Sequence, residues 1–201
     1  MRIVDDVPAL WEAAPLRILA RFRAQLRERR INTESEMLLR QADTPNNVLV
    51  LANLARWVGP IRCIEALLFA AQDERIPILD ASTEFVAFIL RSPDRRTLKI
   101  YNYTRNLDGI GNVARMLGLI EADVATGWIL EAVLHNHNFH PDDPALNGAV
   151  APSEPDATLM RNLAERFVLR EAWITNGVET ARIPASAFSE LSGEAETRQR
   201  P

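Results

Sequence analysis

The stretch that decides both the fold and the site of this chain is Leu134-His135-Asn136-His137-Asn138-Phe139-His140. All three histidines of the 201-residue sequence lie within it, and the largely apolar residues 130–134 that lead into it predict a buried strand. Because side chains alternate between the two faces of a strand, His135 and His137 point the same way, with their Cα atoms roughly 6–7 Å apart. Two imidazoles at this spacing can bind one divalent metal ion.

A third ligand is offered by Ser153-Glu154-Pro155-Asp156, where a short polar helix begins. If that helix brings Asp156 to the histidines, two imidazoles and a carboxylate leave a fourth position open for water, which is a composition suited to catalytic zinc. The same four residues also form an ordinary capping pattern, with serine at the N-cap and aspartate at N3, so the sequence leaves both interpretations open. Asp142 and Asp143 are alternative ligands, and His140 is expected in a loop.

The order of these residues resembles a known metallopeptidase motif. His-x-His on a strand, followed by Ser-x-x-Asp at the start of a helix, resembles the motif of the JAMM/MPN (Mov34/PAD-1) superfamily. The amino-acid sequence of residues 133–137 is most similar to the RadC-like branch of that superfamily. The resemblance extends from Asp80 to Leu191, and the loop 138–152, which is longer than in the family, is expected to border the cleft. The fold class that it implies is α/β (α+β): a JAMM/MPN-like, cytidine-deaminase-like central mixed β-sheet flanked by helices.

The resemblance also assigns roles to individual residues. It implies a zinc-dependent hydrolase of peptide or isopeptide bonds, in which His135, His137 and Asp156 bind the zinc ion. Ser153 would lie near the water or the oxyanion. Glu84 would be the general acid/base that takes a proton from the water and passes it to the leaving amine.

The position of Glu84 agrees with that role. Residues 85–90 and 98–103 predict a hairpin, and Glu84 stands directly before its first strand, as the family's glutamate does. Glu131 is the rival candidate. It lies four residues before His135 on the same predicted strand, roughly 13 Å away along the chain, which is too far to act on the same water.

The remaining pattern predicts two parts, a helical N-terminal segment over residues 1–76 and the JAMM/MPN-like catalytic domain over residues 77–201. In the segment, helices are expected over 8–30, from an N-cap near Thr33 to Arg40, over 48–58 and over 61–72. In the domain, the further expected elements are a glycine-containing turn at 106–111, a helix over 112–119, a strand over 128–134, a helix over 157–167 and a hairpin over 171–183 around Asn176-Gly177.

The composition argues against nucleic-acid and membrane partners. The formal net charge is −4, and no apolar run approaches the roughly 18 residues of a spanning helix. An HNH nuclease, suggested only by the letters at 135–137, is therefore disfavoured. The single Cys63 is suited to close helix packing and fits a reducing compartment. The first residues lack the apolar core of a signal peptide, so a cytoplasmic protein is expected. The family resemblance implies a protein or peptide substrate.

A second hypothesis is a catalytically silent MPN-like module. In that case the N-terminal helices would recruit a partner or form a homodimer contact. An exposed apolar face on residues 45–72 would support this alternative.

Overall fold

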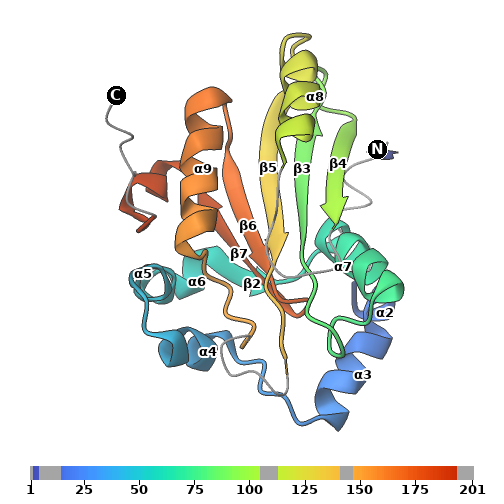
Figure 1. The fold of residues 1–201 in the computed structure, drawn as a ribbon, viewed down its shortest axis with the longest axis vertical. Coiled ribbons are helices and arrows are strands. Elements are labelled where there is room, and N and C mark those ends of the chain that lie inside the picture. The colour runs from blue at the N-terminus through green and yellow to red at the C-terminus, as the bar shows by residue number, and fades with distance from the viewer. Residues whose placement is uncertain (1, 5–14, 105–112, 141–146, 194–201) are drawn as a thin grey trace.

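A mixed β-sheet runs through the molecule (Figure 1), and within the described part of the chain it has seven strands in the order β1-β4-β3-β5-β6-β7-β2. The computed structural model describes residues 2–4, 15–104, 113–140 and 147–193. The strands are β1 (Arg2–Val4), β2 (Val58–Pro60), β3 (Phe85–Arg91), β4 (Leu98–Thr104), β5 (Ile129–Asn136), β6 (Glu171–Thr175) and β7 (Glu179–Pro184). β5 and β6 are parallel and the other neighbouring pairs are antiparallel. This confirms the mixed α/β class, while the JAMM/MPN-like detail stays a prediction.

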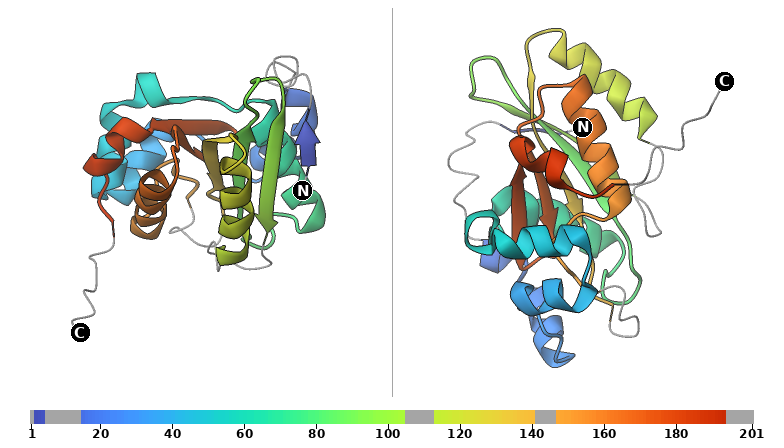
Figure 2. Two further views of the ribbon diagram at one scale, coloured as in Figure 1. Left: turned by 90° about the horizontal axis from the view of Figure 1, so that it is seen from above. Right: turned by 90° about the vertical axis from the view of Figure 1, so that its left-hand side faces the viewer.

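Helices flank this sheet. They are α2 (Pro15–Ile18), α3 (Ala20–Glu28), α4 (Ser35–Ala42), α5 (Pro45–Ala52), α6 (Leu54–Trp57), α7 (Cys63–Arg75), α8 (Ala114–Val124), α9 (Glu154–Arg166) and the 3₁₀ helix η1 (Ala185–Glu190). Figure 2 shows α8 and α9 side by side on one face of the sheet. Within the described ranges, no helix combines the length and the apolar character needed to cross a membrane.

The pairing of β5 with its two neighbours brings three distant segments of the chain to one end of the sheet. β3 runs antiparallel to β5 with Val86 opposite His135, so the residues just before β3 lie beside the last residues of β5. β6 runs parallel to β5, and the crossover between them contains α9. The start of β3, the end of β5 and the start of α9 therefore meet at one place, the carboxyl end of a central strand, where open α/β sheets usually bind ligands.

The N-terminal segment differs from the expectation of a purely helical region. β1 pairs with β4 at one edge of the sheet, and β2 pairs with β7 at the other. The helix expected over 48–58 is divided into α5 and α6, and Val58 already belongs to β2. Gly59 and Pro60 explain this difference, because proline cannot continue a helix and an edge strand tolerates its missing N–H.

Side chains of the N-terminal helices belong to the same hydrophobic core as the sheet. Phe22 of α3 and Phe69 of α7 meet edge to face, with ring centroids 4.8 Å apart. The division at residue 76 stays a prediction. The helix expected over 8–30 appears as α2 and α3, while its residues 8–14 lie outside the described ranges.

The hairpin predicted from Asn176-Gly177 is confirmed as the turn between β6 and β7. The Asn176 side-chain oxygen accepts hydrogen bonds from the backbone N–H groups of Val178 and Glu179, both at 2.9 Å. Gly177 has φ +83°, and a Cβ there would lie 2.6 Å from the Phe69 ring. Glycine is therefore required both by the left-handed backbone and by the close packing of α7.

Other local expectations agree with the structure within a few residues. The hairpin around residues 92–96 is β3–β4, and the helix expected over 157–167 is α9, which begins earlier because Ser153 caps it. The strand expected over 128–134 is β5, and the helix expected over 112–119 is α8, which extends to Val124. The turn at 106–111 lies outside the described residues.

Candidate metal centre

Three ligand atoms converge at the carboxyl end of β5. His135 is the penultimate residue of β5, His137 follows the strand, and Asp156 lies in the first turn of α9. One donor atom from each residue lies within 4.8 Å of the other two. The His137 Nε2–Asp156 Oδ2 distance is 3.2 Å and the His135 Nε2–Asp156 Oδ1 distance is 3.7 Å, close to the roughly 3.3–3.5 Å ligand separations of tetrahedral zinc.

The outer nitrogens of both imidazoles are fixed by backbone carbonyls. His135 Nδ1 lies 3.0 Å from the carbonyl oxygen of Phe85, and His137 Nδ1 lies 2.8 Å from that of Ala149. A carbonyl oxygen can only accept, so each Nδ1 carries the proton. Each Nε2 is thereby directed toward Asp156, which is the orientation that outer hydrogen bonds give to metal-binding histidines.

Asp156 is held in place by the helix cap. Its Oδ2 accepts hydrogen bonds from the Ser153 backbone N–H at 2.9 Å and from the Ser153 hydroxyl at 2.7 Å, while Ser153 Oγ accepts from the Asp156 N–H at 3.3 Å. This reciprocal capping box leaves Oδ1 facing His135. The capping and ligand interpretations are thus compatible, because the cap fixes the orientation of the carboxylate.

The charges of the cluster depend on one another. Burial raises the pKa of Asp156, but the electrostatic interaction with His135 and the hydrogen bond from His137 outweigh it and hold that pKa well below the usual range. Burial lowers the pKa of His137, but the hydrogen bond and charge of Asp156 outweigh it, so its pKa is raised. Both ring nitrogens of His137 face acceptors, an arrangement that favours its protonated form.

Glu84 completes the cluster, as its position before β3 requires. Its Oε1 lies 3.8 Å from His135 Nε2, and its side chain is only 13% exposed. Glu131 points elsewhere, because its carboxylate pairs with Arg91 at 3.2 Å and with Arg170 at 3.6 Å. Glu131 is also absent from the residues that line the site cavity described below, and the expected distance of roughly 13 Å along the strand stays a prediction.

The two asparagines between and after the histidines hold the segment that carries Glu84. Asn136 accepts from the Phe85 N–H at 2.6 Å and donates to the Thr83 carbonyl at 3.1 Å. Asn138 donates to the same carbonyl at 2.7 Å and accepts from Asn136 at 2.6 Å. We call these two side chains the asparagine clamp.

Sequence reasoning missed the asparagine clamp. The available signal was strand alternation, which places Asn136 on the face opposite to the histidines, where a buried amide requires partners. Both side chains are buried, with 0% and 3% exposure. The partners themselves, however, lie more than fifty residues earlier in the chain, so local pattern does not identify them.

The cluster lies in a cavity of about 590 Å³. All five predicted site residues line it, namely Glu84, His135, His137, Ser153 and Asp156. The corner between α4 and α5 supplies a further wall through Ala42, Thr44 and Asn47. Lysine and arginine are absent from its described lining, whereas Glu84 and Asp156 both belong to it.

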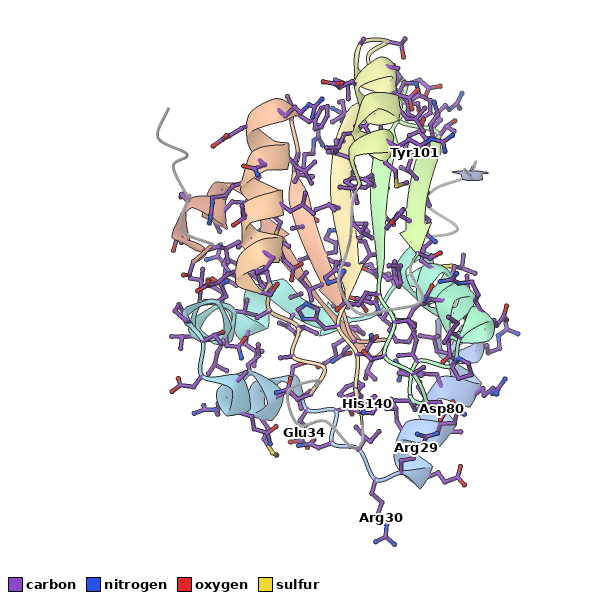
Figure 3. The ribbon with its side chains drawn as sticks, in the orientation of Figure 1. Arg29, Arg30, Glu34, Asp80, Tyr101 and His140 are labelled. Atoms are coloured by element: carbon purple, nitrogen blue, oxygen red, sulfur yellow. The ribbon has the colours of Figure 1, made fainter. Side chains whose placement is uncertain are left out.

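The remaining candidates do not join the cluster within the described residues. His140 lies near the same end of the molecule as Glu34 and Asp80 (Figure 3) and does not line the cavity. Asp142 and Asp143 lie outside the described ranges. Ser153 directs its hydroxyl to Asp156, so its expected role near the water or the oxyanion stays a prediction.

The donor set fits a zinc ion, with two directed imidazole nitrogens and one carboxylate oxygen, and the Glu84 carboxylate lies beside them. Comparisons with protein-family models, curated proteins and solved structures return no match. The resemblance to the JAMM/MPN superfamily therefore rests on the motif residues.

Proposed function

We propose that this protein is a zinc-dependent hydrolase of amide bonds, a JAMM-type metallopeptidase for peptide or isopeptide substrates. The observation that carries the proposal is the convergence of His135, His137 and Asp156 with the Glu84 carboxylate, 3.8 Å from one ligand atom, in one cavity. A triad of ligands with an adjacent carboxylate is the arrangement of catalytic rather than structural zinc sites.

A zinc ion in this position supplies Lewis acidity, which lowers the pKa of a water and polarises the scissile carbonyl. Glu84 accepts the proton of the attacking water and delivers it to the leaving amine. His135 and His137 keep their Nε2 atoms directed inward because Phe85 and Ala149 hold the opposite nitrogens.

The lining of the cavity favours a neutral substrate group. Sites for phosphate esters usually offer arginine, lysine or a second metal ion to the phosphoryl oxygens. The described lining has none of these cations, and its remaining polar groups are amides and hydroxyls such as Asn47, Asn147 and Thr44. An amide carbonyl fits such surroundings better than a dianionic phosphate.

The test is cleavage of fluorogenic peptide and isopeptide substrates by the zinc-loaded full-length protein, with Glu84→Gln as the control. The substitution preserves the size of the side chain and removes the base, so turnover should fall by about 10²–10⁴-fold while zinc remains bound. Equal turnover in both proteins would exclude Glu84 as the base. No cleavage by a protein that does bind zinc would favour the silent module instead.

The structure gives the silent-module alternative little support. Between residues 45 and 72, Val48 is the one exposed large hydrophobic side chain, at 56% exposure. The apolar face that a recruiting surface would need is therefore not formed by this segment. A partner or homodimer contact through the N-terminal helices stays a prediction.

A further inference from the structure

A second cavity, of about 310 Å³, lies beside the edge strand β2. It is lined by residues 56–62 and by Arg182 of β7. We call it the arginine pocket, because Arg56, Arg62 and Arg182 contribute its three guanidinium groups. Its lining contains three arginines, whereas the described lining of the cavity with the candidate metal centre contains no arginine or lysine.

Arg182 is a fixed element of this pocket. Its Nη2 donates to Glu65 Oε1 at 2.7 Å and to the Pro60 carbonyl at 3.2 Å, and its side chain is only 12% exposed. Glu65 itself is fully buried. The Nε of Arg182 is buried and has no hydrogen-bond partner within the described structure, so the guanidinium keeps an unused donor.

The other two guanidiniums lie at the surface of the pocket. Arg56 and Arg62 are exposed, and neither forms an ion pair with a carboxylate of the described residues. Burial lowers the pKa of Arg182, Glu65 counteracts this effect, and the positive charge of Arg62 lowers it further, so these two guanidiniums repel one another. Glu65 and Glu171 offset part of this positive charge, but no acidic residue of the described ranges lines the pocket itself, so its lining is cationic.

We propose that the arginine pocket binds a phosphoryl group, either free phosphate or the phosphate end of a small organic phosphate. Guanidinium groups match phosphate oxygens with paired hydrogen bonds, and a cationic lining without a described acidic residue attracts an anion. The volume lies at the lower end of the range of small-molecule sites. Trp57 provides an apolar wall for an attached organic group. The inference does not rest on the hydrolase proposal.

The test is isothermal titration of the full-length protein with inorganic phosphate, pyrophosphate and AMP at constant ionic strength. The protein is first treated with a chelator and dialysed, because phosphate also binds zinc. The variant is Arg56→Gln with Arg62→Gln, two exposed positions whose substitution leaves the Glu65–Arg182 pair intact. Arg96→Gln, an exposed arginine in the β3–β4 turn, is the matched control for loss of charge.

Wild type and the Arg96→Gln control should bind about one anion per chain, and the double variant should bind at least about tenfold more weakly. Tighter binding of AMP than of phosphate identifies an organic phosphate, whereas equal binding identifies free phosphate, and either result supports the site. The proposal is overturned if none of the three anions binds the wild type at millimolar concentration, or if the double variant binds them as the wild type does.

Discussion

The side-chain nitrogen of Asn138 donates a hydrogen bond of 2.7 Å to the carbonyl oxygen of Thr83, the residue immediately before Glu84. Asn136 donates to the same oxygen and accepts from the N–H of Phe85, the residue immediately after Glu84. The backbone on both sides of the proposed base is therefore held by residues 136 and 138, which alternate with the proposed ligands His135 and His137. These hydrogen bonds hold the proposed base in a fixed position relative to the proposed ligands.

Asn138→Ala should separate metal binding from the positioning of Glu84. The substitution leaves the Thr83 carbonyl and the Asn136 amide with fewer partners in a buried region, which should lower the free energy of unfolding by about 1–3 kcal/mol. Zinc content should stay unchanged, while turnover falls because Glu84 is less well positioned. Denaturant unfolding, metal analysis and turnover measure the three effects. The control is Asn53→Ala, which removes a hydrogen bond to Leu49 away from the cavity and should leave turnover intact.

Zinc affinity should fall as the pH falls, beginning above pH 6.5. The pKa of His137 is raised from 6.5, and zinc must displace the proton on its Nε2. In chelator-treated protein the same raised pKa contributes stability that is fully present below 6.5 and is lost as the pH rises through the raised value.

Competition with a zinc-binding dye measures this dependence, which should approach about tenfold per pH unit for one displaced proton. His140→Ala is the control, because His140 does not line the cavity, and it should leave the profile unchanged. An affinity that stays constant down to about pH 6 would show that no imidazole proton is displaced.

Ser153→Ala should weaken both α9 and the metal centre. Loss of the cap should cost about 0.5–2 kcal/mol of stability. Loss of the hydroxyl that orients Asp156 should weaken zinc binding by about 10–100-fold. Thr44→Ala removes the cap of α5, where the side chain accepts from the Asn47 N–H at 3.2 Å, without touching a proposed ligand. If both variants lost the same zinc affinity, Ser153 would have no specific role at the metal.

Gly177→Ala tests the packing of the β6–β7 turn. The positive φ and the close approach of Phe22 and Phe69 should together cost several kcal/mol. Gly118→Ala is the control, because a Cβ at this position of α8 meets no atom within 4 Å, and it should stabilise the helix by about 0.5–1 kcal/mol. Thermal unfolding compares the two, and equal effects would show that the turn tolerates a side chain.

The local elements around the candidate metal centre could be predicted because their signals are short-range. Asn176-Gly177 specifies a turn through its own backbone preferences, and Ser153 begins α9 through bonds within a single helical turn. The shared face of His135 and His137 follows from strand alternation alone.

The register between strands could not be predicted in the same way. The placement of Glu84 depends on the pairing of Val86 with His135, which joins residues nearly fifty positions apart. The use of β2 as an edge strand likewise depends on β7, which lies more than a hundred residues later. The motif resemblance supplied the position of Glu84, but it contained nothing about the asparagine clamp or the arginine pocket.

The most direct test of the central claim is the zinc content of the purified protein after zinc is supplied and the excess removed. The proposal predicts about one zinc ion per chain in the wild type and in His140→Ala, and none in His137→Ala or Asp156→Ala. A wild type without zinc, or ligand variants that retain as much as the wild type, would contradict the metal centre on which the proposed function depends.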